Sequence, residues 1–376
     1  MKINRQIICS FIFVVFLVTV TGTALASDVN VEQVGHLGGV TNTVDIVGNY
    51  AYVGQGQDFL IMDITNPSSP VLLGKIMTNG IVNDIKISGN YAYIADNSNG
   101  LLIVDISNPS SPVLKGSYKT AGSANDVSIS GNYAYIADNS NGLFIVDISN
   151  PSTPILKGSY FNGEYHRDVS VSGNYAYIAD ESNGLFIVDI SDPSSPVLKG
   201  SYTAVGAIDV SVSGNYAYVT DYNGLFIVDI SDPSSPVLKG SYTAVGATYV
   251  SVSGNYAYVT SADNDLLIVD ISNPSSPVLK GSYETAGSAI DISVSGNYAY
   301  IAGYQKGLEI VDISNPSTPI LKGSYTPVFA NDVSVSGNYA YIPDNSNGLL
   351  IVDISNPSSP VPVSYTHLTL PTNREV

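Results

Sequence analysis

The sequence predicts an all-β fold, a β-propeller of eight four-stranded antiparallel blades, and three observations lead to this prediction. One unit recurs eight times at intervals of 40 to 42 residues. Each unit holds four short runs with the alternation typical of β-strands. Turn-forming residues separate these runs at the same places in every unit. Units of this length bury their apolar faces only against neighbouring units, as propeller blades do. One glycine marks the start of the most regular segment in each unit: Gly48, Gly89, Gly131, Gly173, Gly214, Gly254, Gly296 and Gly337.

The third repeat shows the four predicted strands and the turns between them. Gly131-Asn132 separates the first two strands and supplies the positive φ values of a two-residue hairpin. The segment Asp-Asn-Ser-Asn-Gly, ending at Gly142, forms the second turn, and it lacks the distant bidentate glutamate of a calcium-binding EF-hand loop. Pro151 and Pro154 interrupt the chain before the fourth strand. The four strands are expected at 126–130, 133–137, 143–148 and 155–160.

The order of strands across each blade follows from their composition. The third strand, Leu-x-Ile-Val-Asp-Ile, is apolar on both faces and suits the interior of the disc. The first strand is polar on one face, so we expect it to line the central channel. The fourth strand carries a lysine after a proline, which protects an exposed sheet edge and places this strand outermost. These lysines are Lys115, Lys157, Lys199, Lys239, Lys280 and Lys322.

The ends of the chain depart from the repeat. Residues 1–26 have a basic start, an apolar run and the small residues Ala24-Leu25-Ala26, which together predict a secretory signal peptide. The propeller is expected to span residues 27–361 as one domain. Within it, residues 31–37 resemble a fourth strand that would complete the eighth blade, and residues 359–361 begin another strand for the same slot. Residues 362–376 abandon the repeat, and we expect this tail not to be native.

Composition narrows the classes of function. The single cysteine, Cys9, lies in the predicted leader, so the mature chain would have no thiol for disulfides, metal binding or nucleophilic catalysis. Removing the leader takes away two of the 14 basic residues and none of the 32 acidic ones, which leaves a net charge near −20. Such a surface repels nucleic acid and anionic lipid. We therefore expect a secreted or cell-surface monomer that neither binds nucleic acid nor inserts into a membrane after signal cleavage.

The motif Leu-x-Ile-Val-Asp-Ile-Ser-Asn/Asp-Pro, as at residues 101–109 and 225–233, closely resembles the LVIVD-repeat family of bacterial and archaeal surface proteins. Its eight copies extend the resemblance over nearly the whole mature chain. The resemblance implies an exported β-propeller and attaches no activity to it.

Most of the conspicuous residues have structural explanations. Of the 27 tyrosines, 23 occupy fixed places in the repeat, where pairs such as Tyr133 and Tyr135 alternate with the small Ala134 and favour packing between blades. The aspartate that ends each third strand should accept backbone N–H bonds and stabilise the turn that follows. They include Asp105, Asp147, Asp189, Asp229, Asp270, Asp312 and Asp353.

A second set of aspartates begins the first strands, and propeller symmetry would gather it into a ring at the channel mouth. Thr43 and Tyr249 occupy the equivalent positions in the other two repeats. Two interpretations remain open. The carboxylates could recruit calcium or magnesium, for which oxygen-rich rings are suited, or each could cap its own loop. The six candidate metal ligands are Asp84, Asp126, Asp168, Asp209, Asp291 and Asp332.

The sequence offers little for catalysis. Its histidines are His36, His166 and His367, too few for a multi-histidine metal site, and no nucleophile elbow, phosphate loop or zinc motif is present. We therefore predict a protein that is not an enzyme and needs no cofactor. An extracellular hydrolase or lyase that uses carboxylates at the channel mouth is the alternative, and a structural surface-layer component is a third class.

Differences among the copies indicate where a partner would bind. The connections between first and second strands and between third and fourth strands hardly vary, whereas the other two connections do. The variable connections emerge on one side of the disc, and binding residues concentrate on loops held by a rigid frame. We predict that this face binds an extracellular protein or glycan. The predicted contact residues are Phe161, Glu164, Tyr165, His166, Arg167, Tyr222, Tyr249, Tyr304, Gln305 and Lys306.

Overall fold

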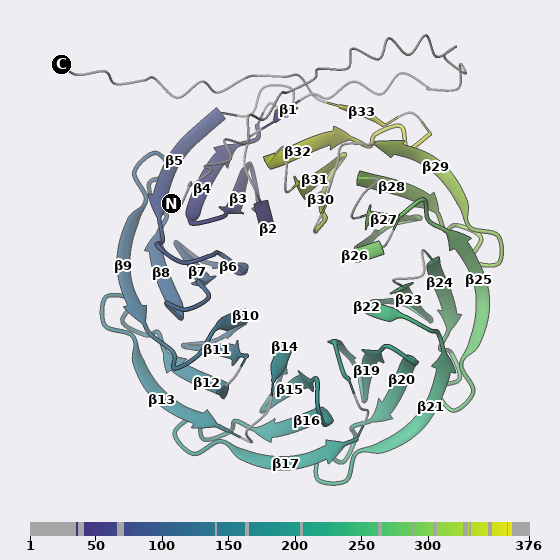
Figure 1. Ribbon diagram of the computed structural model, residues 1–376, viewed down its shortest axis with the longest axis horizontal. Helices are drawn as coiled ribbons and strands as arrows, with labels where there is room; N and C mark the ends of the chain where they lie inside the picture. The colour runs from purple at the N-terminus through teal and green to yellow at the C-terminus, as the bar shows by residue number, and fades with distance from the viewer. Residues whose placement is uncertain are drawn as a thin grey trace, which may run out of the picture.

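The computed structural model describes residues 35–36, 41–65, 71–139, 141–161, 165–203, 206–261, 265–287, 289–303, 307–325, 330, 332–344, 348–358 and 360–362. Its strands form eight antiparallel sheets arranged in a ring around a central channel (Figure 1). This arrangement confirms the predicted eight-bladed β-propeller. Within these residues, no helix has the length and apolar character needed to cross a membrane.

Each blade runs outward from the channel in chain order. The innermost strands are β2 (Thr41–Val47), β6 (Asp84–Ser88), β10 (Ala124–Ser130), β14 (His166–Ser172), β18 (Asp209–Ser213), β22 (Ala247–Ser253), β26 (Ala289–Ser295) and β30 (Ser334–Ser336). The second strands are β3 (Tyr50–Gln55), β7 (Tyr91–Ala95), β11 (Tyr133–Asp138), β15 (Tyr175–Asp180), β19 (Tyr216–Asp221), β23 (Tyr256–Ser261), β27 (Tyr298–Gly303) and β31 (Tyr339–Asp344).

The remaining strands form the outer half of each blade. The third strands are β4 (Asp58–Asp63), β8 (Leu101–Asp105), β12 (Gly142–Asp147), β16 (Gly184–Asp189), β20 (Gly224–Asp229), β24 (Asp265–Asp270), β28 (Gly307–Asp312) and β32 (Gly348–Asp353). The outermost strands are β5 (Val71–Met77), β9 (Val113–Tyr118), β13 (Ile155–Tyr160), β17 (Val197–Tyr202), β21 (Val237–Thr243), β25 (Val278–Glu284) and β29 (Ile320–Tyr325).

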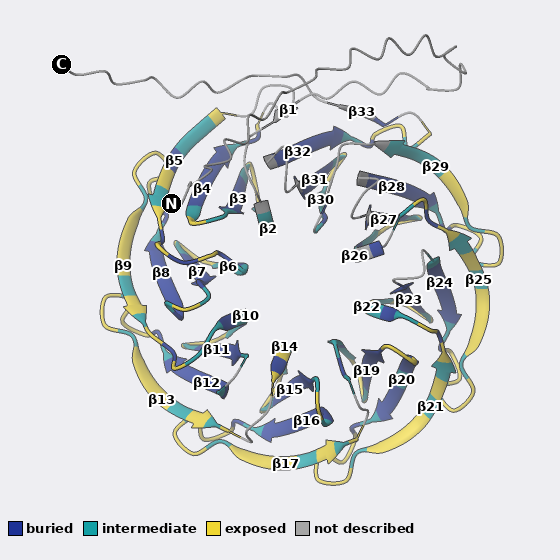
Figure 2. Ribbon diagram, in the orientation of Figure 1, coloured by how far each residue is buried: buried dark blue, intermediate teal, exposed yellow. Residues whose placement is uncertain are grey.

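The hydrophobic core lies between blades rather than within them. Second and third strands are buried on both faces, whereas the outermost strands are exposed (Figure 2). In one cluster, Tyr93 and Ile103 of the second blade pack against Ala134 and Ile136 of the third. The tyrosine–alanine alternation predicted for packing is therefore confirmed, because the large ring of one blade fits over the small side chain of the next. A blade alone would leave this surface in water.

The rim joins neighbouring blades by close steric contact. Gly200 of β17 lies against the proline turn of the next blade, so closely that a Cβ at this position would overlap the carbonyl oxygen of Pro233 and the ring of Pro236. The same approach of an outer-strand glycine to the next proline turn recurs from Gly74 to Gly323. The repeated Gly and Pro-Ser-Ser-Pro elements of the sequence are thus two halves of one contact.

The ring closes in the eighth blade, where two short strands share the outermost slot. Residues of β1 (Gly35–His36) pair with Ile351 and Leu350 of β32, and residues of β33 (Val361–Pro362) pair with Asp353 and Val352. The described residues of both predicted segments therefore occupy the outermost position of the eighth blade, each along a different part of β32. A cluster that combines Tyr341 and Ile351 with Ala51 and Val53 packs the eighth blade against the first.

Candidate functional site

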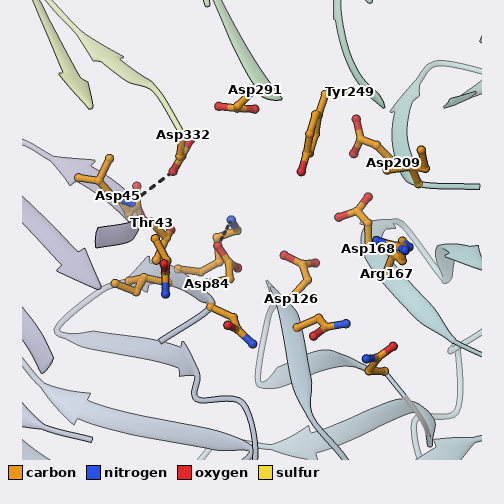
Figure 3. Close-up of a pocket in the computed structure, with 18 of the residues that line it drawn as sticks. Thr43, Asp45, Asp84, Asp126, Arg167, Asp168, Asp209, Tyr249, Asp291 and Asp332 are labelled. Atoms are coloured by element: carbon orange, nitrogen blue, oxygen red, sulfur yellow. Dashed lines mark hydrogen bonds and ion pairs between the residues drawn. The ribbon is translucent and has the colours of Figure 1, made fainter. Parts of the chain in front are cut away.

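The mouth of the central channel contains a cavity of about 1120 Å³ (Figure 3). First residues of the innermost strands line it, together with Asn139, Glu181 and Ser182 from connections between second and third strands. Those connections belong to the variable face, so the cavity opens there. The cavity therefore brings the acidic ring and the variable face, which the sequence suggested as separate features, into one place.

All six predicted ring aspartates line this cavity (Figure 3). In each, Oδ2 accepts a hydrogen bond from a backbone N–H in or directly before the innermost strand of the following blade. The expectation that each aspartate caps its own loop is therefore wrong. The main contact of each carboxylate is a hydrogen bond that links its blade to the next one. The six bonds are Val127 N–H to Asp84 at 3.3 Å, Val169 to Asp126 at 3.2 Å, Val210 to Asp168 at 3.1 Å, Val250 to Asp209 at 2.8 Å, Val333 to Asp291 at 3.0 Å and Val44 to Asp332 at 3.3 Å.

Among the described residues, asparagine amides form a second link one residue earlier in three blades. The amide nitrogens of Asn42, Asn83 and Asn125 donate to backbone carbonyls of the next blade at 3.1, 2.8 and 3.4 Å. An Asn-Asp pair at the start of a first strand therefore satisfies both an acceptor and a donor of its neighbour. Pairing buried backbone groups in this way stabilises the hub without any continuous sheet between blades.

Neighbouring carboxyl groups also lie within hydrogen-bonding reach of one another, Asp84 with Asp126, Asp168 with Asp209, and Asp291 with Asp332. Burial first, and then the charge of Asp209, raises the pKa of Asp168 to about 8. Burial likewise raises the pKa of Asp209 to about 6. The pKa values of Asp126 and Asp332 rise well above their ordinary value through burial and the charge of the paired aspartate. The pairs thus hold protons at pH values where isolated aspartates have lost them.

Two residues at the channel mouth were not predicted from the sequence. Asp45 and Lys86 lie two positions after Thr43 and Asp84, where the other six repeats have serine. Asp45 accepts the N–H of Ile87 at 3.0 Å, which links the first blade to the second although Thr43 provides no carboxylate. Lys86 places its ammonium 3.2 Å from Asp84. A comparison of this one position across the repeats would have found both residues.

The geometry gives no support to the predicted calcium or magnesium site. Across the described residues, no three side chains of His, Cys, Asp or Glu converge so that they could hold a metal ion. The ring carboxylates are instead directed to backbone N–H groups and to each other, and Lys86 already supplies a cation to Asp84. Each of these backbone hydrogen bonds uses one carboxylate oxygen, Oδ2, and the calcium or magnesium site stays a prediction.

Apart from His166, the structure separates the predicted contact residues into three groups. Tyr165, Arg167 and Tyr249 line the cavity. Phe161 and Tyr222 lie on connections of the same face, with 61% and 53% of their surfaces exposed. Glu164, Tyr304, Gln305 and Lys306 lie outside the described residues.

His166 does not belong to this surface, which corrects the expectation that it contacts a partner. Its side chain is fully buried, with Nε2 3.5 Å from Oδ2 of the equally buried Asp180 and its ring against Phe186. Burial is the main cause that lowers the pKa of His166. Most other repeats have alanine at this position, so His166 fills the space between strands and adds a polar contact to Asp180.

Two copy-specific features shape the cavity wall. Arg167, where several repeats have asparagine, contacts Glu181 through Nη2 at 2.8 Å and Nε at 3.1 Å. Tyr249, where six repeats have aspartate, lies between Asp209 and Asp291 and extends into the mouth (Figure 3). Its pKa is raised by burial and by the surrounding carboxylates, so its hydroxyl keeps its proton and can donate a hydrogen bond.

Comparison with known proteins identifies the family and the fold. The LVIVD repeat matches at residues 38–78, 79–120, 121–162, 163–204, 206–244, 246–285, 286–327 and 329–366, and the chain belongs to this family. No curated protein matches the chain.

Several solved structures are similar to the chain over most of its length. The computationally designed protein Ika8 is 11% identical, covers 85% of this chain and 99% of its own, and has a TM-score of 0.71. Sqt1 of Saccharomyces cerevisiae is 10% identical, with coverages of 87% and 100% and a TM-score of 0.72. BamB of Moraxella catarrhalis is 12% identical, with coverages of 82% and 95% and a TM-score of 0.65. At these identities the likeness shows the propeller fold alone.

Proposed function

We propose that this chain is an exported, non-enzymatic binding scaffold that holds an extracellular protein or glycan on its variable face. One observation carries the proposal: residues that differ among the copies, Tyr165, Arg167, Glu181 and Tyr249, line the cavity at the channel mouth. The repeated residues hold the frame through contacts between blades. Side chains that the frame does not need therefore surround a concave site, as in many ligand-binding sites.

The basic and apolar leader at residues 1–26 supports export to the cell surface or the surrounding medium. The strong negative charge supports a soluble monomer and argues against nucleic acid as the partner. The carboxylate pairs give weaker support to the alternative function, a hydrolase. An acid–base hydrolase needs two carboxyl groups with distinct roles, whereas here three pairs repeat around the ring and each aspartate holds the next blade.

A loop exchange tests the proposal while preserving the frame. Residues 161–167 would be replaced by residues 119–125, which occupy the same place one repeat earlier and have the same length. We expect the purified mature protein to capture a cell-envelope protein or an arrayed glycan, and the exchanged protein to lose that capture. Screening against polysaccharides and esters addresses the hydrolase, and turnover abolished by Asp168→Asn would overturn the proposal.

The matched control changes the opposite face in the same blade. Asp192→Asn with Ser195→Thr converts the proline turn of the fourth blade to that of the third. This variant should retain full capture. If the loop exchange also retains full capture, residues 161–167 do not take part in binding.

A further inference from the structure

One group of exposed apolar side chains on the variable face lies beside the fourth to sixth blades, apart from Met77 and Ile81 at the connection between β5 and β6. Phe161 and Tyr165 lie between β13 and β14, Tyr222 between β19 and β20, and Val245 between β21 and β22. Their exposed fractions are 61%, 50%, 53% and 68%. With Tyr249 they form what we call the aromatic sector, which spans the fourth to sixth blades. In the described connections of the opposite face, no large apolar side chain is exposed.

The inner border of the aromatic sector is acidic. Asp168 and Asp209 lie at hydrogen-bonding distance from one another, and Tyr249 lies next to Asp209 (Figure 3). Arg167 is close by, but its guanidinium is held by Glu181 at 2.8 Å. Among the described residues that line the cavity, Lys86 is the only other cation, and it contacts Asp84 two blades away from Asp168.

The position of Lys86 shows that the ring of carboxylates accommodates a cation. Its ammonium occupies the mouth beside one carboxyl pair, Asp84 and Asp126, at 3.2 Å from Asp84. The pair Asp168 and Asp209 has the same arrangement of carboxyl groups, and no lysine of its own follows either residue, since Ser170 and Ser211 stand there. A cation from outside the chain can take the place beside this pair that Lys86 takes beside the other.

We infer that the partner of the variable face is a protein segment that inserts a lysine or arginine side chain beside Asp168 and Asp209 and packs flanking apolar residues on the aromatic sector. This inference rests on the proposed binding function and specifies its partner. Opposite charge at the centre and aromatic side chains around it are the composition of protein interfaces in which a few buried anchors dominate affinity. The face of Tyr249 adds an attractive surface for a cation.

Binding of this kind would release protons. Burial and the charge of Asp209 raise the pKa of Asp168 to about 8, so the pair carries a proton near neutral pH. An arriving cation favours the charged carboxylate and displaces that proton. A neutral glycan would form hydrogen bonds with the protonated pair and would displace none.

A displayed library of random heptapeptides tests the inference with a defined probe. Peptides selected on the mature protein should contain a lysine or arginine with apolar neighbours. For one selected peptide, replacing arginine with the neutral citrulline, or lysine with norleucine, should weaken binding roughly tenfold, which corresponds to about 1.4 kcal/mol. Calorimetry in two buffers of different ionisation enthalpy should show proton release.

The double variant Asp168→Asn with Asp209→Asn should weaken binding of the selected peptide to the same extent. Asparagine keeps an oxygen for the N–H groups of Val210 and Val250, so the blades stay linked. The matched control, Asp189→Asn with Asp229→Asn on the rim, should leave affinity unchanged. Phe161→Ser should weaken binding of the selected peptide several-fold, because an apolar contact is lost.

Three results would overturn the inference: enriched peptides without a basic residue, equal affinity of the neutral peptide, or no peptide bound at all. If oligosaccharides bind instead and the loop exchange abolishes that binding, the proposed function stands and only the partner class is wrong. If neither peptide nor saccharide binds and the exchanged protein behaves like the original, both proposals fail.

Discussion

The hub and the rim of the disc each carry a ring of aspartates, and the two rings behave in opposite ways. At the hub, burial and neighbouring carboxyls raise the pKa of Asp168 to about 8. At the rim, the hydroxyl of Ser314, the ammonium of Lys322 and the N–H of Ser314 lower the pKa of Asp312 to about 2. The same residue type thus favours its neutral form in one place and its charged form in the other.

The cause is the identity of the hydrogen-bond partners and the presence of like charges. Each rim aspartate accepts the N–H of the residue two positions later, for example Ser191 to Asp189 at 3.0 Å, as predicted for the turns. Lysines of the same blade lie nearby, such as Lys199 at 3.5 Å from Asp189. The rim ring is therefore built from local contacts. The hub ring is built from contacts between blades, and it gathers carboxyls that repel one another when charged.

Blades are also joined differently in the two regions. Hub links are hydrogen bonds to carboxylates and depend on protonation, whereas the rim link is the steric fit of a glycine against a proline turn. This difference leads to four predictions about stability, ordered from the largest effect to the smallest.

Breaking one steric link at the rim should have the largest effect. In Gly200→Ala the new methyl would overlap the carbonyl oxygen of Pro233, and relieving this overlap requires the two blades to shift apart. We expect the free energy of unfolding to fall by about 1–3 kcal/mol. Chemical denaturation at pH 7 measures the change.

Gly173→Asn provides the control, because a side chain at Gly173 would meet only open space and asparagine tolerates its φ of +59°. This variant should lose less than about 1 kcal/mol. Equal losses in the two variants would contradict a specific role of Gly200 in the contact with the next blade.

Neutralising one hub aspartate should stabilise the protein at alkaline pH. A carboxyl group whose folded pKa is raised contributes stability below its unfolded pKa, near 3.8, and loses that contribution as pH rises through its folded pKa, about 8 for Asp168. Asp168→Asn resembles the protonated form at every pH. Thermal unfolding should show the variant equal to the original chain near pH 3, below the unfolded pKa, and increasingly more stable from there to pH 9, by about 2 kcal/mol or more.

The equivalent change at the rim should have the opposite sign. The hydroxyl and N–H of Ser191 lower the pKa of Asp189, so its contribution is present above the unfolded pKa and is lost as pH falls through the folded pKa. Asp189→Asn should cost about 0.5–1 kcal/mol at pH 7 and nothing near pH 2. Parallel pH profiles for the hub and rim variants would contradict the assignment of opposite shifts.

Removing a rim ion pair should have the smallest effect. Lys199 and Asp189 lie 3.5 Å apart, and 38% of the lysine side chain is exposed. We expect Lys199→Met to change the free energy of unfolding by less than about 0.5 kcal/mol, because solvent and salt screen such pairs. Denaturation at low and high salt measures it, and a loss above about 1 kcal/mol would show that these pairs matter beyond shielding the sheet edge.

The blade was predictable because its determinants are local. Alternation within strands, Gly-Asn hairpins and the proline turn lie within one repeat, and the structure places them as expected. Part of the site was also predictable, since equivalent positions in a ring must meet at its centre. The burial of His166 was not, because its neighbours Asp180 and Phe186 come from other strands and the variable loop beside it suggested a surface residue.

The amino-acid sequence alone determined the four strands of a blade, their order from channel to rim, the number of blades and the face that varies among the repeats. These follow from hydrogen bonding and burial over distances of a few residues to one repeat. Closure of the ring came only with the folded chain, since Asp332 meets Val44 across 288 positions. The same closure sets the protonation of the hub, because the pKa of each carboxyl depends on burial and on charges that distant repeats bring beside it.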